Sequence, residues 1–201
     1  TYPPLDDSEI DILLNQKKGW SFGVDDIETS QTDIEYVNEG TTRAGNLMAL
    51  TADNYAWSLY GDAGYQINDG VASPSTGALP VNSSNVVEVL QAATQYFDEH
   101  DVPIADRNLI VEPWFKNKMV LAKLNRETPL GDSVYMNGFV GDILGFKVYM
   151  SNQLTAGHQL ALSSRAIAYA DQINKVESVR LIDTFGDGVR GLFTFGAKTM
   201  F

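Results

Sequence analysis

The chain has 201 residues, no cysteine and a net charge of −12. A surface this acidic repels phosphates and anionic lipids, which argues against sequence-specific nucleic-acid binding and against binding to membranes. Disulfides and thiolate metal sites are excluded, and no apolar run reaches the roughly 20 residues that a membrane-spanning helix needs.

The N-terminal part of the sequence predicts a strand followed by a long helix. In residues 17–24 apolar side chains alternate with small or polar ones, which is typical of a half-buried strand. Apolar residues then recur at spacings of three and four over residues 27–60. This spacing predicts a helix that is either kinked or built to span something, since Gly40 and Gly45 lie inside it. Residues 61–80 are rich in Gly, Ser and Pro and predict a loop.

The middle of the sequence predicts two further helices around a buried strand. Asn85 is a candidate N-cap for a helix with an apolar stripe. The apolar run of residues 108–111 indicates a buried strand. Pro113 is favoured at the first position of the next helix, which we expect to extend to about Leu124. Residues 134–149 have the glycine-rich texture of strands and turns.

The C-terminal part of the sequence predicts strands. Residues 160–170 are compatible with either a helix or a strand. Residues 175–184 and 189–199 flank a glycine-containing turn at residues 185–188, which predicts a long hairpin. Because helices dominate the first half and strands the second, the fold class is predicted to be α+β rather than a series of β-α-β units.

Few residues in the sequence point to chemistry. The stretch DEHD, residues 98–101, offers carboxylates and an imidazole, which suit a divalent cation. Adjacent residues on a helix do not share a face, so a solvated helix end is the favoured interpretation. The serines near His158 lack the strand-turn-helix context of a hydrolase nucleophile, and no phosphate-binding glycine motif is present. The sequence therefore predicts no catalytic residue, no cofactor, no metal site and no enzymatic activity.

Four segments, in this order, resemble the major capsid (coat) proteins of tailed double-stranded DNA bacteriophages. Together they cover most of the chain from about Lys17 onward, and their order is more specific than any one of them alone. The segments are FGVDDIETSQ (22–31), YFDEHDVPIADRNLIVEP (96–113), GFVGDILGFKVYMSNQL (138–154) and SRAIAYADQINKVESVRLIDTFGDGVRGLFTFGAKTM (164–200).

The resemblance implies a fold and a division into domains. The fold would be the α+β fold of tailed-phage major capsid proteins, in which the long helix forms a spine. A peripheral domain would comprise residues 1–59 and the closing hairpin in residues 164–201, and an axial domain would comprise residues 60–163. Little chain precedes Lys17, where the family carries an N-terminal arm and an extended loop, so we expect a partial or trimmed chain.

The resemblance also implies a function. The chain would be a structural subunit that self-assembles, as hexamers and pentamers, into the icosahedral capsid shell that encloses phage double-stranded DNA. Assembly would take place in the host bacterial cytoplasm, with a scaffolding protein and a portal as further partners. The charged residues of the closing hairpin, Arg180, Asp183 and Arg190, are candidates for subunit contacts. Two alternatives stay open: a nanocompartment shell protein of the same fold, and a metal-dependent enzyme that uses DEHD.

Overall fold

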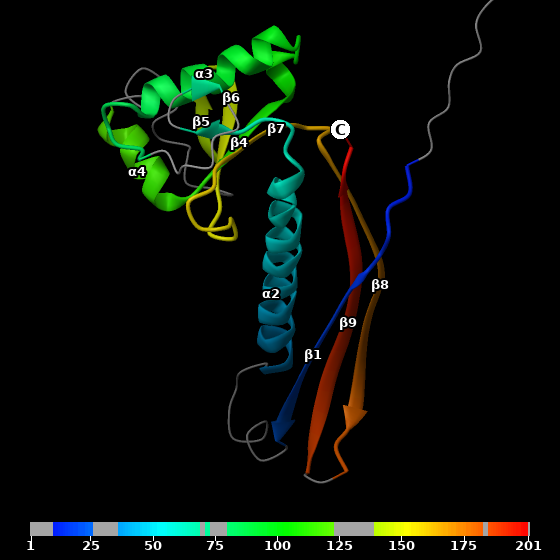
Figure 1. The fold of residues 1–201 in the computed structure, drawn as a ribbon. Coiled ribbons are helices and arrows are strands. Elements are labelled where there is room, and N and C mark those ends of the chain that lie inside the picture. The colour runs from blue at the N-terminus through cyan, green and yellow to red at the C-terminus, as the bar shows by residue number, and fades with distance from the viewer. Residues whose placement is uncertain are drawn as a thin grey trace, which may run out of the picture. The chain divides into compact units, whose positions relative to one another are not determined.

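The computed structural model describes residues 10–25, 36–68, 71–72, 80–122, 139–182 and 185–200. The chain divides into two compact units, each with its own sheet (Figure 1). Unit 1 comprises Thr1–Ala56 and Ile167–Met200, and unit 2 comprises Trp57–Ala166 and Phe201. The two ends of the chain thus build one unit together, while the middle builds the other.

The sheet of unit 1 is antiparallel and has the strand order β1-β9-β8. Strand β1 (Gln16–Asp25) confirms the strand that the sequence predicts at residues 17–24. Strands β8 (Ile167–Arg180) and β9 (Gly186–Thr199) form the predicted C-terminal hairpin. β8 begins at Ile167, so the last part of the ambiguous segment 160–170 is strand.

The long helix α2 (Tyr36–Ser58) packs against this sheet (Figure 1). Its predicted first residues, 27–35, lie outside the described residues, and the short 3-10 helix η1 (Leu59–Asp62) replaces its predicted last turn. A Cβ on Gly40 would stand 2.6 Å from Cζ of Phe22, so this glycine allows helix and strand to approach closely. Near the other end of α2, the ring of Tyr55 contacts that of Phe195 at 5.7 Å.

The turn of the hairpin is not where the sequence predicts it. Gly186 and Gly188 belong to β9, and the turn precedes them. A Cβ on Gly186 would stand 2.4 Å from the carbonyl oxygen of Val24, and one on Gly188 would stand 2.9 Å from Cδ2 of Leu181. Glycine is therefore required at these two positions because neighbouring atoms of the sheet approach the backbone closely, and not because the chain turns there.

Unit 2 is built on a mixed four-stranded sheet with the order β5-β6-β4-β7. Its strands are β4 (Arg107–Val111), β5 (Phe139–Ile143), β6 (Phe146–Met150) and β7 (Leu160–Ser163). The helices α3 (Val86–Glu99) and α4 (Pro113–Leu121) contribute buried side chains to the same core as β4, β5 and β6. The largest fully buried side chains of this core are Phe115, Phe146 and Met119.

Three local predictions for unit 2 need correction. The predicted loop 61–80 contains a short hairpin of β2 (Ile67–Asn68) and β3 (Val71–Ala72), and helix α4 ends at Leu121 instead of Leu124. Asn85 precedes α3, but its side chain does not cap the helix. It bonds backward instead: its Oδ1 accepts from the amide of Asn82, 2.7 Å away, and its Nδ2 donates to the carbonyl of Pro80.

Within the glycine-rich segment, residues 139–150 form a tight hairpin. β5 and β6 are joined by Leu144 and Gly145, which have φ values of 49° and 81°. A two-residue loop with both residues at positive φ matches the right-handed twist of the flanking strands. Gly141 has a φ of 132° at the register shift in β5. These glycines thus have a backbone role, which agrees with the absence of a phosphate-binding motif in this segment.

Candidate functional site

The charged residues proposed for subunit contacts lie on the hairpin of unit 1. Arg190 in β9 donates through Nε and Nη2 to Oε2 of Glu177 in β8, at 3.1 and 2.8 Å. Arg180 in β8 lies 3.3 Å from Asp187 in β9. Both pairs follow the strand register, which places each arginine opposite its carboxylate. Asp183 lies outside the described residues. Within one subunit the two arginines therefore join the strands of the hairpin, and their role in subunit contacts stays a prediction.

Glu177 accepts from two cations on this surface. Lys175 and Arg190 both form ion pairs with its carboxylate. The hydrogen bond from Lys175, followed by that from Arg190, holds the pKa of Glu177 below its ordinary value. The exposed cluster is worth little to stability, because water and salt screen it.

We expect an NMR pH titration to show a lower midpoint for Glu177 in the folded subunit than in the urea-unfolded chain. The depressed pKa means that the ion pairs persist down to the folded-state pKa and are lost as the pH falls through it. Lys175→Ala is expected to raise the Glu177 midpoint more than Arg190→Ala does, since Lys175 is the larger cause of the shift. Equal midpoints for Glu177 in the folded and the unfolded chain would contradict this network.

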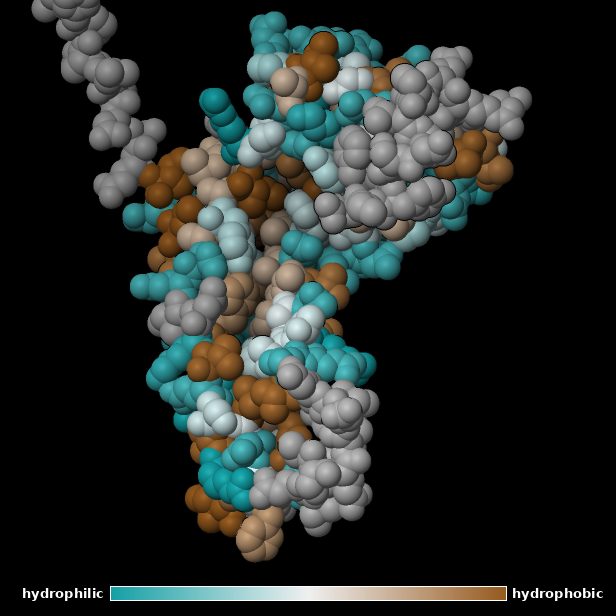
Figure 2. All heavy atoms as spheres, turned by 180° about the vertical axis from the view of Figure 1, so that it is seen from behind, coloured by the Kyte–Doolittle hydropathy of each residue, from teal (hydrophilic) through white to brown (hydrophobic). Residues whose placement is uncertain are grey.

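The end of the hairpin exposes large apolar side chains. Ile182 is 99% exposed and Phe185 is 83% exposed, and Leu181 beside them is also exposed. Figure 2 shows hydrophobic, brown to tan atoms at this end of the sheet. The sequence placed these residues in or beside a turn without assigning them a function. An apolar residue next to a hairpin turn is the signal that could have found them, because turns are normally polar.

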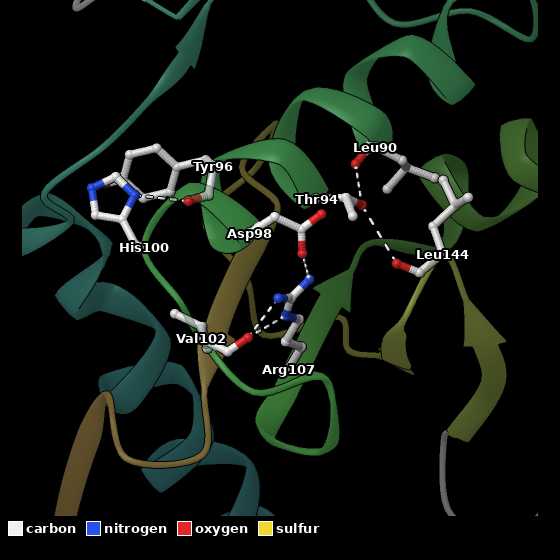
Figure 3. Close-up of polar contacts among 8 residues, drawn as sticks. All are labelled: Leu90, Thr94, Tyr96, Asp98, His100, Val102, Arg107 and Leu144. Atoms are coloured by element: carbon white, nitrogen blue, oxygen red, sulfur yellow. Dashed lines mark hydrogen bonds and ion pairs between the residues drawn. The ribbon is translucent and has the colours of Figure 1, made fainter.

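The residues of the DEHD stretch do not converge on one point. Asp98 pairs with Arg107 at 2.7 Å, and Glu99 accepts a hydrogen bond from Gln95 at 2.7 Å. His100 stacks on the ring of Tyr96 at 4.1 Å, and its Nδ1 lies 2.8 Å from the carbonyl oxygen of the same residue (Figure 3). In the described part of the chain no three His, Asp or Glu side chains are grouped as a metal site. The geometry thus matches a helix end.

A buried arginine organises the corner after this helix. Arg107, at the start of β4, is 3% exposed. Its Nε and Nη2 donate to the carbonyl oxygen of Val102 at 3.0 and 2.5 Å, and its Nη1 pairs with Asp98 (Figure 3). Its guanidinium also lies over the ring of Phe97. Charge-assisted bonds of this kind are strong and directional. They join the end of α3, the Val102-Pro103 turn and β4, which gives the Val-Pro-then-Arg pattern of the sequence a structural role.

A comparison with protein families and one with solved structures both gave matches over nearly the whole chain. The sequence profile described as phage capsid protein matches residues 14–199. A solved structure from Mycobacterium phage Che8 aligns with a TM-score of 0.73 at 25% identity, over 98% of this chain and 72% of that one. Among curated protein sequences there is no match.

Two further solved structures share the fold at lower identity. The capsid structure of cyanophage P-SCSP1u aligns with a TM-score of 0.69 at 17% identity, over 99% of this chain and 76% of that one. A virus-like particle from Pyrococcus furiosus aligns with a TM-score of 0.54 at 12% identity, over 92% of this chain and 71% of that one. No helix in the described residues is long and apolar enough to cross a membrane.

Proposed function

The chain belongs to the phage capsid protein family and is a structural subunit of a capsid shell, and we propose that it builds an icosahedral shell by repeated contact with copies of itself. The match over residues 14–199, which reaches into both units, is the observation that carries the proposal. Closed shells arise when each subunit presents different surfaces to its neighbours and these head-to-tail contacts close into rings. Rings of six and five subunits would supply the hexamers and pentamers of such a shell.

The two compact units support an assignment of domains. We assign unit 1, with α2 as the spine, to the peripheral domain, and unit 2 to the axial domain. The boundary in the first half of the chain falls between Ala56 and Trp57, and the second falls between Ala166 and Ile167. Both lie within about three residues of the boundaries inferred from the resemblance to capsid proteins, a difference within the usual uncertainty of boundaries read from a sequence.

The acidity of the chain fits a wall around packaged DNA. With a net charge of −12, the subunit would bind the enclosed phosphates only weakly, so the DNA stays free to move during packaging and release. A structural role needs no catalytic residues, and we propose that the chain is not an enzyme. Assembly in the host cytoplasm, together with a scaffolding protein and a portal, belongs to the same proposal.

Electron microscopy of purified particles tests the proposal and separates it from the alternative shell function. A capsid subunit is expected to give closed shells, alone or with a scaffold, and particles recovered from phage lysates should contain DNA. A nanocompartment of the same fold would enclose protein cargo instead. If the protein forms no rings, sheets or shells under any condition, with or without a scaffold, the proposed function is wrong.

We expect charge reversal at the hairpin to reduce shell yield without unfolding the subunit. Arg180→Glu with Arg190→Glu replaces two exposed ion pairs by repulsive ones, which costs the subunit roughly 0–1 kcal/mol per pair. The same change repeated at every contact of a shell is expected to lower the particle yield several-fold. Circular dichroism and melting temperature report the fold, and sedimentation reports the particles.

Arg43→Glu is the matched control, since Arg43 is also an exposed, paired arginine but lies on α2. Its reversal is expected to leave the yield close to that of the unchanged protein. A normal yield for the Arg180, Arg190 double variant would show that these arginines are not contact residues. An equal loss for Arg43→Glu would point to net charge instead of the hairpin.

A further inference from the structure

Strand β8 ends the sheet of unit 1 with an open edge. The sheet order is β1-β9-β8, and no strand of the described chain pairs with the outer side of β8. The outer edge of this 14-residue strand presents a row of backbone donors and acceptors that another extended segment can use. The edge also exposes apolar side chains, since Val176 is 58% exposed and Val179 is exposed as well.

The four charged residues of β8 alternate in sign around Val176. The order along the strand is Asp171, Lys175, Glu177 and Arg180. Their positions along the sheet can be compared through the register with β9, because each of them pairs with a known β9 residue. Val176 pairs with Gly191, while Lys175 and Glu177 pair with the β9 residues on either side of it, Leu192 and Arg190.

The outer two charges are also placed symmetrically. Arg180 pairs with Asp187, and Asp171 pairs with Phe195. Since 191 − 187 = 4 and 195 − 191 = 4, both lie four rows from Val176, one on each side. The equality depends on the register shift between Gln172 and Lys175, where β8 contains one residue more than β9. Without this bulge the two charges would lie in unequal positions and on opposite faces.

From this symmetry we infer that the β8 edge is an interface for the β8 edge of a second copy of this chain, with the two strands antiparallel and Val176 on the two-fold axis. In that arrangement Lys175 of each copy faces Glu177 of the other, and Arg180 faces Asp171. Each charge thus meets an opposite charge on its own face of the sheet: Lys175 and Glu177 on one face, Asp171 and Arg180 on the other. The inference rests on the proposed shell function, and it names one contact within it.

The energetic basis of the contact is the backbone edge and not the charges. Joining the two three-stranded sheets would give the backbone N–H and C=O groups at the outer edge of each β8 strand hydrogen-bond partners, and it would cover Val176. Exposed ion pairs add only about 0–1 kcal/mol each. The charges mainly determine the register and the direction of the two strands, because a slipped or parallel arrangement would place like charges opposite each other. Antiparallel pairing also places the two Ala166–Ile167 junctions, where each chain passes into unit 2, at opposite ends of the paired strands.

The absence of cysteine from the chain makes a direct test possible. In a single Val176→Cys variant, the two thiols on the axis would have Cα atoms about 4.5–5.5 Å apart, within the range of a disulfide. Ser178→Cys is the matched control, on the same face of the same strand and also exposed. Its two copies would lie about four rows apart, roughly 13 Å, which no disulfide spans.

Both full-length variants are assembled and oxidised, and then examined by non-reducing electrophoresis and by electron microscopy. We expect on the order of tenfold more disulfide-linked dimer for Val176→Cys than for Ser178→Cys, given the geometric limits of the bond. Particles without that difference would overturn the β8 interface and leave the shell function standing. The expected dimers without particles would support the interface and contradict the shell function. Neither dimers nor particles would overturn both.

Discussion

Phe195→Ala is expected to lower the free energy of unfolding by about 3–5 kcal/mol, because the substitution removes the largest buried side chain of unit 1. Phe195 is 0% exposed, and its ring contacts three others: Tyr55 on α2, Tyr169 on β8 and Phe193 on β9. The cavity left by alanine would therefore loosen both the hairpin and the attachment of the helix. The midpoint of thermal unfolding of the unassembled subunit is expected to fall by on the order of 10 °C.

Phe185→Ala is the matched control for this prediction. It makes the same chemical change at a side chain that is 83% exposed, so little free energy from burial of the ring is lost. We expect a change within about 0.5 kcal/mol in the subunit. An effect of Phe195→Ala no larger than that of Phe185→Ala would show that Phe195 does not hold the unit together.

Arg107→Met is expected to destabilise unit 2 by about 2–3 kcal/mol. Methionine retains most of the apolar stem, so the loss reports the bonds to the Val102 carbonyl and to Asp98. The expected cost lies below the 3–5 kcal/mol typical of breaking a fully buried ion pair, because the Asp98 side chain is well exposed and can be hydrated. Urea unfolding followed by circular dichroism measures the change.

Two further variants make this prediction specific. Arg190→Met removes an exposed arginine with a carboxylate partner, and it is expected to cost roughly 0–1 kcal/mol. Asp98→Ala leaves the buried Arg107 charge without its carboxylate partner, so combining it with Arg107→Met should cost less than the sum of the two single changes. Strict additivity would mean that Asp98 and Arg107 do not act as a pair.

The strand-and-helix order of the chain could be predicted from the sequence because local patterns carry it. Alternation identified β1, and the run of residues 108–111 identified most of β4. Pro113 marked the first residue of α4. The long helix was confirmed within residues 36–58. The sequence was less informative in residues 160–170, which are compatible with helix or strand and contain all of β7 and the start of β8.

Glycine was the residue most often misread. Gly186 and Gly188 predicted a turn, yet both lie in β9 against the backbone of β1 and the side chain of Leu181. Gly40 suggested a kinked or spanning helix, but the structure explains it by the ring of Phe22, which leaves no room for a Cβ at this position. A glycine shows only that a Cβ would be unfavourable. Whether the cause is a positive φ or a neighbouring atom depends on contacts with residues far away in the chain.

The sequence by itself determined the elements, the acidic charge and the resemblance to capsid proteins, since these depend on residue types and on spacings of a few positions. The tertiary structure alone decided that β1 pairs with β9, and that Arg107 is buried between the Val102 carbonyl and Asp98. It also decided that the charges of β8 are symmetric about Val176, because that symmetry exists only when the register with β9 and its one-residue bulge are known. Strand pairing joins residues that are distant in sequence, so no local pattern specifies it.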